Sequence, residues 1–233
     1  MSWLQDLGDH FSRAFLENDR YLAYLKGFGV TLEVSFFAVL LGVVIGIILA
    51  VIKYNAVRRK GFRPLGWIAN VYIAIIRGTP VYVQMMILYY MIFTMRGFPA
   101  TLAGVICFGL NSSAYVAEII RAGIEAVDRG QSEAGRSLGL SEMQTMKSII
   151  MPQAIKNILP ALGNEFIVLI KETSIMGGIA VLDVTKAAMN VGASTYDYLT
   201  PLIIAALMYL VVVIILTKLL SMFEGRLAKS DRR

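Results

Sequence analysis

The sequence predicts an all-α membrane protein with about five transmembrane helices. Of its 233 residues, 57% are hydrophobic and 16% are charged, whereas soluble domains carry about 25% charged residues. The mean hydropathy of +0.67 agrees with this imbalance. Five apolar segments have lengths suited to membrane helices, at about 28–52, 65–95, 101–120, 155–170 and 199–223. Strict alternation and regular turn spacing, which a β-barrel requires, do not occur.

The five segments differ in how cleanly they predict a span. The first carries Glu33 as its only charge and a Gly42/Gly46 pair that favours close helix packing. The second is interrupted by Arg77-Gly78-Thr79-Pro80. The fourth is marginal in length and begins between two prolines, so we expect a long, bent helix with a polar middle, which continues past Lys171.

Basic residues set the expected orientation. The first loop (53–63), the segment 121–156 and the tail are rich in Lys and Arg, and five crossings place all three on one side. The positive-inside rule makes that side cytoplasmic. We therefore expect an extracytoplasmic N-terminal segment (1–27), a transmembrane domain (28–223) with a cytoplasmic loop (129–152), and a basic cytoplasmic tail (224–233). The short turn near 96–100 and the stretch 171–198 fall on the outer side.

Composition also limits the function classes. In a membrane protein the net charge of +6 is first a topology signal, and we expect no nucleic-acid partner. Cys107 is the only cysteine, so the chain forms no internal disulfide. The start of the chain lacks the pattern of a cleaved signal peptide.

The cytoplasmic loop has the pattern of a helix–turn–helix elbow. Residues up to Leu138 favour helix, and Gly139 can end that helix in a left-handed conformation. Ser141 can cap a second helix, with Gln144 at the capping-box position. Pro152 is expected to limit the second helix and to start the next segment.

This loop resembles the EAA motif of permeases from ATP-binding-cassette (ABC) importers. The motif places Glu-Ala-Ala, Gly and Ile-x-Leu-Pro at fixed spacing, and the chain matches it at Glu133, Ala134, Gly139, Ile149 and Pro152. It departs at Gly135 and Met151. In that family the first short helix docks on a separate ATPase subunit, so the resemblance assigns ATPase coupling to residues Glu133, Ala134, Gly135, Ser137, Leu138 and Gly139. An ordinary solvated loop is the alternative interpretation.

Most of the chain resembles one subgroup, the polar amino acid permeases of the histidine, glutamine, arginine and opine class. The likeness is carried by Arg77-Gly78-Thr79-Pro80 with Val83-Gln84, by 111–124, and by segments of 152–174, and it covers roughly residues 25–225. It implies a type I ABC importer permease fold in the cytoplasmic membrane and inward transport of a polar amino acid. Relatives with cationic substrates carry an acid where this chain has Ala74, which leaves neutral polar amino acids open.

Arg77 lies in the middle of an apolar stretch, where a charge is costly and indicates function unless it is paired. One interpretation is a substrate pocket at the helix break, because broken helices build polar pockets in transporters. The other is a structural ion pair with Glu165 or Glu172.

A second break, Lys171-Glu172-Thr173-Ser174 with Gly177-Gly178, is where the resemblance places the other side of the pocket. Asp183 can either meet a substrate's ammonium group or, at a solvated helix N-terminus, cap the helix that follows it. The predicted substrate-binding residues are Arg77, Thr79, Gln84, Thr173, Ser174, Gly177 and Asp183.

The chain is not expected to be an enzyme. It has no P-loop motif, so ATP and Mg²⁺ belong on a partner ATPase, and its single histidine, His10, offers no base at membrane depth and no metal cluster. The expected partners are ABC ATPase subunits, a second permease subunit (a homodimer or a homologous chain), an extracytoplasmic amino-acid-binding protein and lipid. An ATP-independent channel or carrier of five-helix subunits is the alternative.

Overall fold

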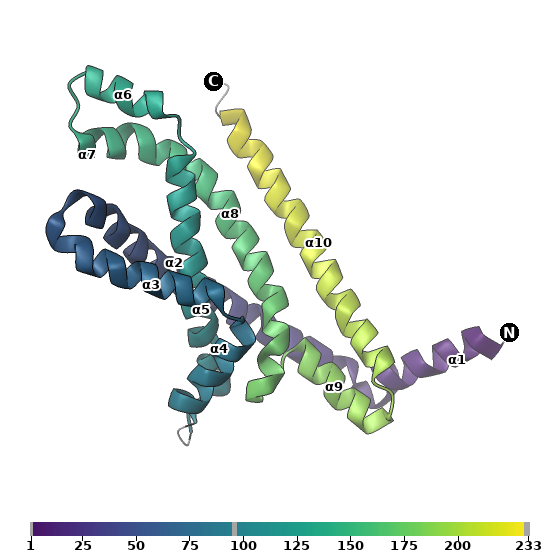
Figure 1. Cartoon of the computed structure of the whole chain (residues 1–233). Coiled ribbons are helices and arrows are strands. Elements are labelled where there is room, and N and C mark those ends of the chain that lie inside the picture. The colour runs from purple at the N-terminus through teal and green to yellow at the C-terminus, as the bar shows by residue number, and fades with distance from the viewer. Residues whose placement is uncertain (1, 95–96, 231–233) are drawn as a thin grey trace. The chain divides into compact units, whose positions relative to one another are not determined.

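The computed structural model describes residues 2–94 and 97–230, and these contain helices and no strand. Parts of two predicted segments, Arg96 in the outer turn and Arg232 and Arg233 in the tail, lie outside the described residues. The α-helices, labelled in Figure 1, are α1 (Ser2–Phe11), α2 (Tyr21–Arg58), α3 (Arg63–Gly78), α4 (Val81–Leu88), α5 (Ala100–Glu125), α6 (Arg129–Ser137), α7 (Glu142–Thr145), α8 (Met151–Glu172), α9 (Val184–Thr195) and α10 (Leu199–Ser230).

Short turns of other helix types extend or join these helices. The wider π-helical turns are Ser12–Leu16, Tyr89–Phe93 and Met146–Ile150. The tighter 3₁₀ segments are Glu17–Asp19, Lys60–Phe62 and Thr173–Ile179.

Three of the described helices are long and apolar enough to cross a membrane, namely α2, α5 and the Leu199–Leu227 part of α10. The pair Lys60–Gly78 and Val81–Phe93 makes a fourth if it is one broken span. The all-helical membrane class is therefore confirmed. The expected count of five includes α8, which does not meet the same test of length and composition, and it stays a prediction.

The second apolar stretch breaks where the sequence predicts. Helix α3 ends at Gly78, and Thr79 is extended (φ −127°, ψ 151°) before α4 begins at Val81. The cause is Pro80, because proline disfavours helical conformation in the residue before it and has no amide hydrogen to donate.

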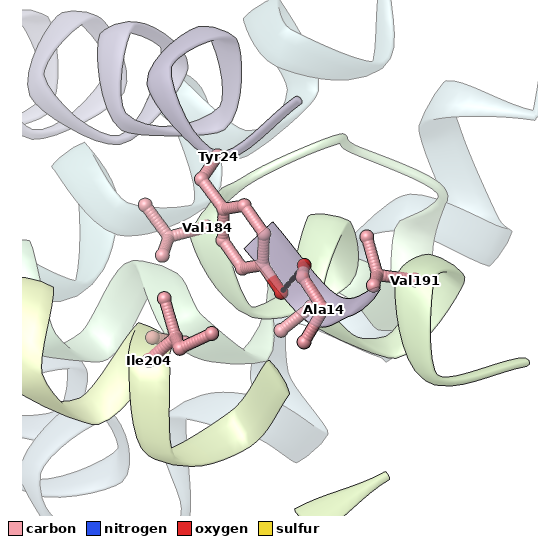
Figure 2. Packing of buried hydrophobic residues seen from close by; sticks show 7 residues of the cluster. Ala14, Tyr24, Val184, Val191 and Ile204 are labelled. Carbon is pink, nitrogen blue, oxygen red and sulfur yellow. Dashed lines mark hydrogen bonds between the residues drawn. The ribbon is translucent and has the colours of Figure 1, made fainter. Parts of the chain in front are cut away.

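The helices gather into two compact units, and the long helices run through both. The first unit comprises Met1–Ala38, Val81–Phe108 and Ile167–Leu216. Its core includes Ala14, Tyr24, Val184, Val191 and Ile204, which are shown in Figure 2. The buried Tyr24 hydroxyl donates a 3.4 Å hydrogen bond to the carbonyl oxygen of Ala14, so the one polar atom of this side chain is satisfied inside an apolar cluster.

The second unit comprises Val39–Pro80, Gly109–Phe166 and Thr217–Arg233. In it α2 packs closely on α5 through Gly42 and Gly46. A Cβ atom added at Gly42 would lie 2.9 Å from the Ser112 side chain, and one at Gly46 would lie 2.6 Å from Val116. The small-residue pair is therefore a packing device, as the sequence predicts.

The long helices differ in burial. In the most apolar window of α5, 61% is buried, compared with 22% for α2 and 17% for α10. Helix α5 is thus a core element, whereas α2 and α10 leave most of their apolar surface free for lipid or another subunit.

Candidate functional site

The predicted elbow forms, and each of its local signals has a structural counterpart. Asp128 caps α6 by accepting a 2.7 Å hydrogen bond from the Gly130 amide. Gly139 ends the helix at φ +81°, and the Leu140 amide donates to the Gly135 carbonyl over 3.1 Å, the bond that defines a Schellman turn. Ser141 and Gln144 then form the expected capping box. Figure 1 shows α6 and α7 as the two arms of this elbow.

Gly135 is the contact point between the two arms. It is buried, and a Cβ atom there would lie 2.7 Å from Cγ2 and 2.9 Å from Oγ1 of Thr145. The absence of a side chain therefore lets α6 lie directly on the second arm. This explains why the chain departs from alanine at this position of the motif.

The other predicted coupling residues are exposed. Glu133, Ala134, Ser137, Leu138 and Gly139 are all accessible, and Leu138 is 79% exposed. The Ser137 hydroxyl donates back to the Glu133 backbone carbonyl oxygen over 3.0 Å, so it is satisfied within α6. A rigid elbow with an exposed leucine and an exposed acid is a surface that can receive a protein partner.

Pro152 does not separate the second arm from the next helix, contrary to expectation. The backbone stays right-handed helical through Met146 (φ −58°, ψ −49°) and Met151 (φ −61°, ψ −42°). Proline is tolerated in the first turn of α8, and the π-helical turn Met146–Ile150 lies directly before it. The elbow therefore continues into α8, so a displacement of α7 passes directly to α8.

Arg77 is paired, and the ion pair is with Glu118. Its Nη1 atom lies 3.8 Å from Glu118 Oε2, and its guanidinium carbon lies 5.5 Å from the Tyr115 ring centre. The two acids considered from the sequence were Glu165 and Glu172. Glu165 instead accepts a 2.7 Å hydrogen bond from the Ser112 hydroxyl.

Glu118 is the centre of a charged cluster on α2, α3 and α5. Lys53 donates to its Oε1 over 2.7 Å, and Arg121 donates to its Oε2 over 2.9 Å. Its side chain is 16% exposed, whereas the Arg77 side chain is 46% exposed. Three cations thus share one largely buried carboxylate, and Arg77 is the most distant of them, with almost half of its side chain exposed.

Sequence reasoning missed Glu118 as a site residue, although a signal was present. Glu118 lies in the third apolar segment, where ionisable groups are rare and functional by default, and Arg121 follows it by three residues. The pairing with Lys53 and Arg77 could not be read from spacing, because these residues lie 65 and 41 positions away.

The predicted substrate residues of the first unit lie on α4 and on the segment after α8. Thr173 is buried, and its hydroxyl donates to the Ile170 carbonyl oxygen over 2.7 Å. Ser174 and Gly177 follow in the same 3₁₀ segment and are half-buried, as is Gln84 on α4. Helix α4 packs against this segment, because a Cβ atom at Gly178 would lie 3.0 Å from the Tyr82 ring.

Asp183 caps α9, as one of its two interpretations predicts, but the solvated helix N-terminus that this interpretation expects is buried instead. It is fully buried, and its carboxylate accepts hydrogen bonds of 3.0 Å from the amides of both Thr185 and Lys186. The Tyr209 hydroxyl donates a third bond over 3.1 Å. The capping role is therefore present in this structure, and substrate binding by Asp183 stays a prediction.

The two sets of predicted pocket residues belong to different units. Arg77 and Thr79 lie in the second unit, and the Thr79 hydroxyl donates to the Ile75 carbonyl oxygen over 2.8 Å. Gln84, Thr173, Ser174, Gly177 and Asp183 lie in the first. A pocket that joins them stays a prediction. Within the described residues, no group of three or more His, Cys, Asp or Glu side chains is arranged to hold a metal ion.

Comparison with known proteins defines the class. Residues 42–229 match the family model of the binding-protein-dependent transport system inner membrane component. The arginine transport system permease protein ArtQ of Bacillus subtilis is 44% identical over 209 residues, covering 89% of this chain and 93% of the relative. A putative glutamine transport system permease protein GlnP of Rickettsia bellii is 42% identical over 213 residues, covering 91% and 95%.

Solved structures agree with the fold. A crystal structure of an amino acid ABC transporter with histidines is similar with a TM-score of 0.84 and 47% identity, covering 91% of this chain and 98% of that one. The MetNI methionine ABC transporter in an inward-facing conformation has a TM-score of 0.76 at 17% identity, which shows a common fold.

The helical membrane fold, the exposed elbow and the relatives together indicate the membrane subunit of a transporter. The chain belongs to the family of binding-protein-dependent transport system inner membrane components. It is a multi-pass permease subunit of an ABC importer in the cytoplasmic membrane, and it is not an enzyme. The ATP-independent channel or carrier is not favoured.

Proposed function

We propose that this permease subunit carries a polar amino acid inward, powered by ATP and Mg²⁺ on a separate ATPase that docks on the elbow. The observation that carries the proposal is the elbow itself. Its α6 arm is fixed by a cap, a Schellman turn and the close contact at Gly135, and its outer face exposes Glu133 and Leu138. The polar amino acid class is supported by relatives described as arginine and glutamine permeases.

The proposed assembly contains two permease subunits, two ATPase subunits and an extracytoplasmic binding protein. Each permease offers one elbow to one ATPase. Closure of the ATPase dimer on ATP moves the elbows, and α8 transmits that movement because it continues from the second arm without a break. The substrate is proposed to contact residues at two helix breaks, Thr79–Pro80 and the Thr173–Ile179 segment.

Docking is tested by crosslinking from a cysteine at Leu138. We expect Leu138→Cys to crosslink to the co-expressed ATPase in at least one nucleotide state. The control is Tyr196→Cys, which is 95% exposed and lies on the predicted outer side. The native Cys107 is buried and gives no background. Absence of a crosslink from Leu138→Cys in every nucleotide state, with the complex intact, argues against docking at this arm.

Coupling is tested by Glu133→Ala. The Glu133 side chain is exposed, so the substitution should leave the permease folded and in the membrane. Because it removes the acid that we propose meets the ATPase, it is expected to reduce ATPase assembly or ATP-driven uptake. Wild-type uptake in this variant removes Glu133 from the mechanism, whereas uptake that persists without the ATPase refutes the importer assignment altogether.

The substrate is tested separately. Isothermal titration of the cognate binding protein with a panel of amino acids identifies the delivered ligand. Asp183→Asn is expected to weaken transport of a substrate with a positive group, and unchanged transport kinetics would exclude Asp183 from the pocket.

A further inference from the structure

An apolar groove lies beside the elbow, within the second unit. Its volume is about 610 Å³, in the range of small-molecule pockets. Its lining comes from α2 with Ile47 and Val51, from α5 with Ile120 and Ile124, and from the Met146–Ile150 turn and α8 with Met146 and Ile155. No part of the predicted substrate pocket or the outer face of α6 lines this groove.

The groove opens into a charged mouth. A second cavity of about 340 Å³ shares Ala50, Tyr54, Ile120, Ile124 and Met146 with the groove. The remaining lining of that second cavity includes Lys53, Arg58, Arg121 and Glu125. The two cavities are therefore one continuous depression with an apolar trough and an ionic end, the shape that fits an amphipathic molecule.

Arg58 is the cation placed to receive an anion at this mouth. Lys53 and Arg121 are already hydrogen-bonded to Glu118, and Arg121 also bonds Glu125. Arg58 lies 3.7 Å over the Tyr54 ring and bonds Glu142 of the elbow, in a pair whose side chains are 37% and 64% exposed. An exposed ion pair is weak, so a stronger anion can displace Glu142.

The charge around Arg58 is positive. The segment from Lys53 to Arg63 contains five basic residues and no acid, and Arg59, Lys60 and Arg63 are all exposed. Basic pockets between membrane helices on the cytoplasmic side suit anionic lipid head groups. An apolar trough that ends in such a segment suits a lipid, whose acyl chain can be buried in the trough. A soluble anion has no apolar part that would occupy it.

We propose that this groove binds an anionic phospholipid of the predicted cytoplasmic leaflet. An acyl chain lies along the trough, and the phosphate bonds Arg58 in place of Glu142. Three methionines of the elbow region, Met143, Met146 and Met151, line the trough, and methionine adapts readily to an irregular ligand. The bound lipid therefore steadies the second arm of the elbow that we propose couples to the ATPase.

The test measures the thermal stability of the complete transporter, permease with ATPase, in detergent. Dioleoyl-phosphatidylglycerol is compared with zwitterionic dioleoyl-phosphatidylcholine at equal concentrations. We expect the anionic lipid to raise Tm more, with about fivefold tighter apparent binding for one added cation contact. Native mass spectrometry of the same samples counts the bound lipid. Equal shifts and equal binding for the two lipids overturn the proposal.

Charge variants assign the preference to Arg58. Arg58→Gln is expected to abolish the difference between the two lipids, and Arg58→Lys to retain it. Glu142→Gln is expected to enlarge the difference, because it removes the competing acid. The matched control is Arg63→Gln, in the same basic segment but not lining the mouth, which keeps most of the preference. Because each variant is compared with itself in two lipids, a change in basal stability does not affect the result.

A groove variant tests the trough. Ala50→Phe fills the depression where the two cavities meet and is expected to abolish the response to both lipids. Val44→Phe, at a position of the same helix that is 58% exposed and outside the groove, is expected to respond as the wild type does. An Ala50→Phe response equal to that of Val44→Phe overturns the proposal. So does a change in the number of permease copies in Ala50→Phe, because it identifies a second copy as the occupant.

Discussion

At the scale of single residues, the charged cluster explains how Arg77 is tolerated in an apolar stretch. Glu118 accepts two short, charge-assisted hydrogen bonds from Lys53 and Arg121 and lies 3.8 Å from Arg77. Its negative charge is therefore secured without Arg77. The Arg77 side chain is almost half exposed, so it is free to exchange its distant partner for another carboxylate, which is what the proposed pocket requires.

Glu118→Gln tests the cluster. The change keeps the shape of the side chain but removes the charge that three cations share, so we expect a loss of stability on the order of 1.5–3 kcal/mol. Glu125→Gln is the matched control, because its side chain is 62% exposed and it pairs with Arg121 at the surface, where such pairs contribute about 0–1 kcal/mol. The measurement is Tm of the purified transporter. Equal losses in the two variants contradict a structural role for the cluster.

Asp197 makes stability depend on pH at the predicted outer surface. Its Oδ1 atom accepts from the amides of Leu199 and Thr200, and its Oδ2 atom lies 2.9 Å from Nδ1 of His10. The hydrogen bond from the Thr200 side chain is the largest effect on the pKa of Asp197 and lowers it. Desolvation opposes this effect, but the bonds from the Thr200 amide and His10 add to it, so the pKa lies below its usual value. The ionised carboxylate is thus the form that caps α10.

The sign of the pH effect follows from the lowered pKa. The stabilisation is complete above the usual Asp pKa of about 3.9 and is lost as pH falls through the lower pKa of the folded protein. We therefore expect Tm to fall more steeply below about pH 4 in the wild type than in Asp197→Asn, which still accepts the capping bonds but does not titrate. Parallel Tm curves for the two proteins would exclude this contribution.

At the scale of elements, the elbow shows which features the sequence predicts well. Gly139, the Ser141–Gln144 capping box and the break before Pro80 act within a few residues, and all three form as expected. The sequence predicts that Pro152 ends the second helix of the elbow. The structure instead has a π-helical turn before Pro152, and the backbone stays helical into α8. The partner of Arg77 depended on distant packing, so spacing along the chain could not identify it.

Gly135→Ala tests the contact between the two arms. The added Cβ atom would lie 2.7 Å from Thr145 Cγ2, and Thr145 is buried, so the arms must separate or the threonine must shift. We expect reduced ATPase coupling, and a lower Tm because overpacking costs about 1–3 kcal/mol of unfolding free energy. The double variant Gly135→Ala/Thr145→Ala is expected to recover both, because it removes the two nearest atoms. No recovery in the double variant would place the defect elsewhere.

At the scale of the whole molecule, local signals predict the helices more directly than the number of crossings. Helices α2, α5 and α10 are identified as candidate membrane spans from the sequence, because each contains a long apolar run. Helix α8 is different: Asn157, Asn164 and Glu165 make it polar, so its place in the membrane must come from burial by other elements. Whether α8 crosses the membrane decides the topology. With α8 as one of five crossings, the basic loops and the elbow lie on one side and α9 on the other.

Cysteine labelling tests whether α8 crosses the membrane. Leu138 and Tyr196 lie on either side of α8 in the chain and are 79% and 95% exposed, and Val57, 82% exposed, marks the first basic loop. With a membrane-impermeant maleimide and right-side-out vesicles, we expect Tyr196→Cys to react at once, and Leu138→Cys and Val57→Cys only after permeabilisation. The buried Cys107 stays unlabelled. Labelling of Leu138→Cys and Tyr196→Cys from the same side would mean that α8 does not cross. The elbow and α9 would then face one compartment, and α8 could not carry the movement of an ATPase across the membrane.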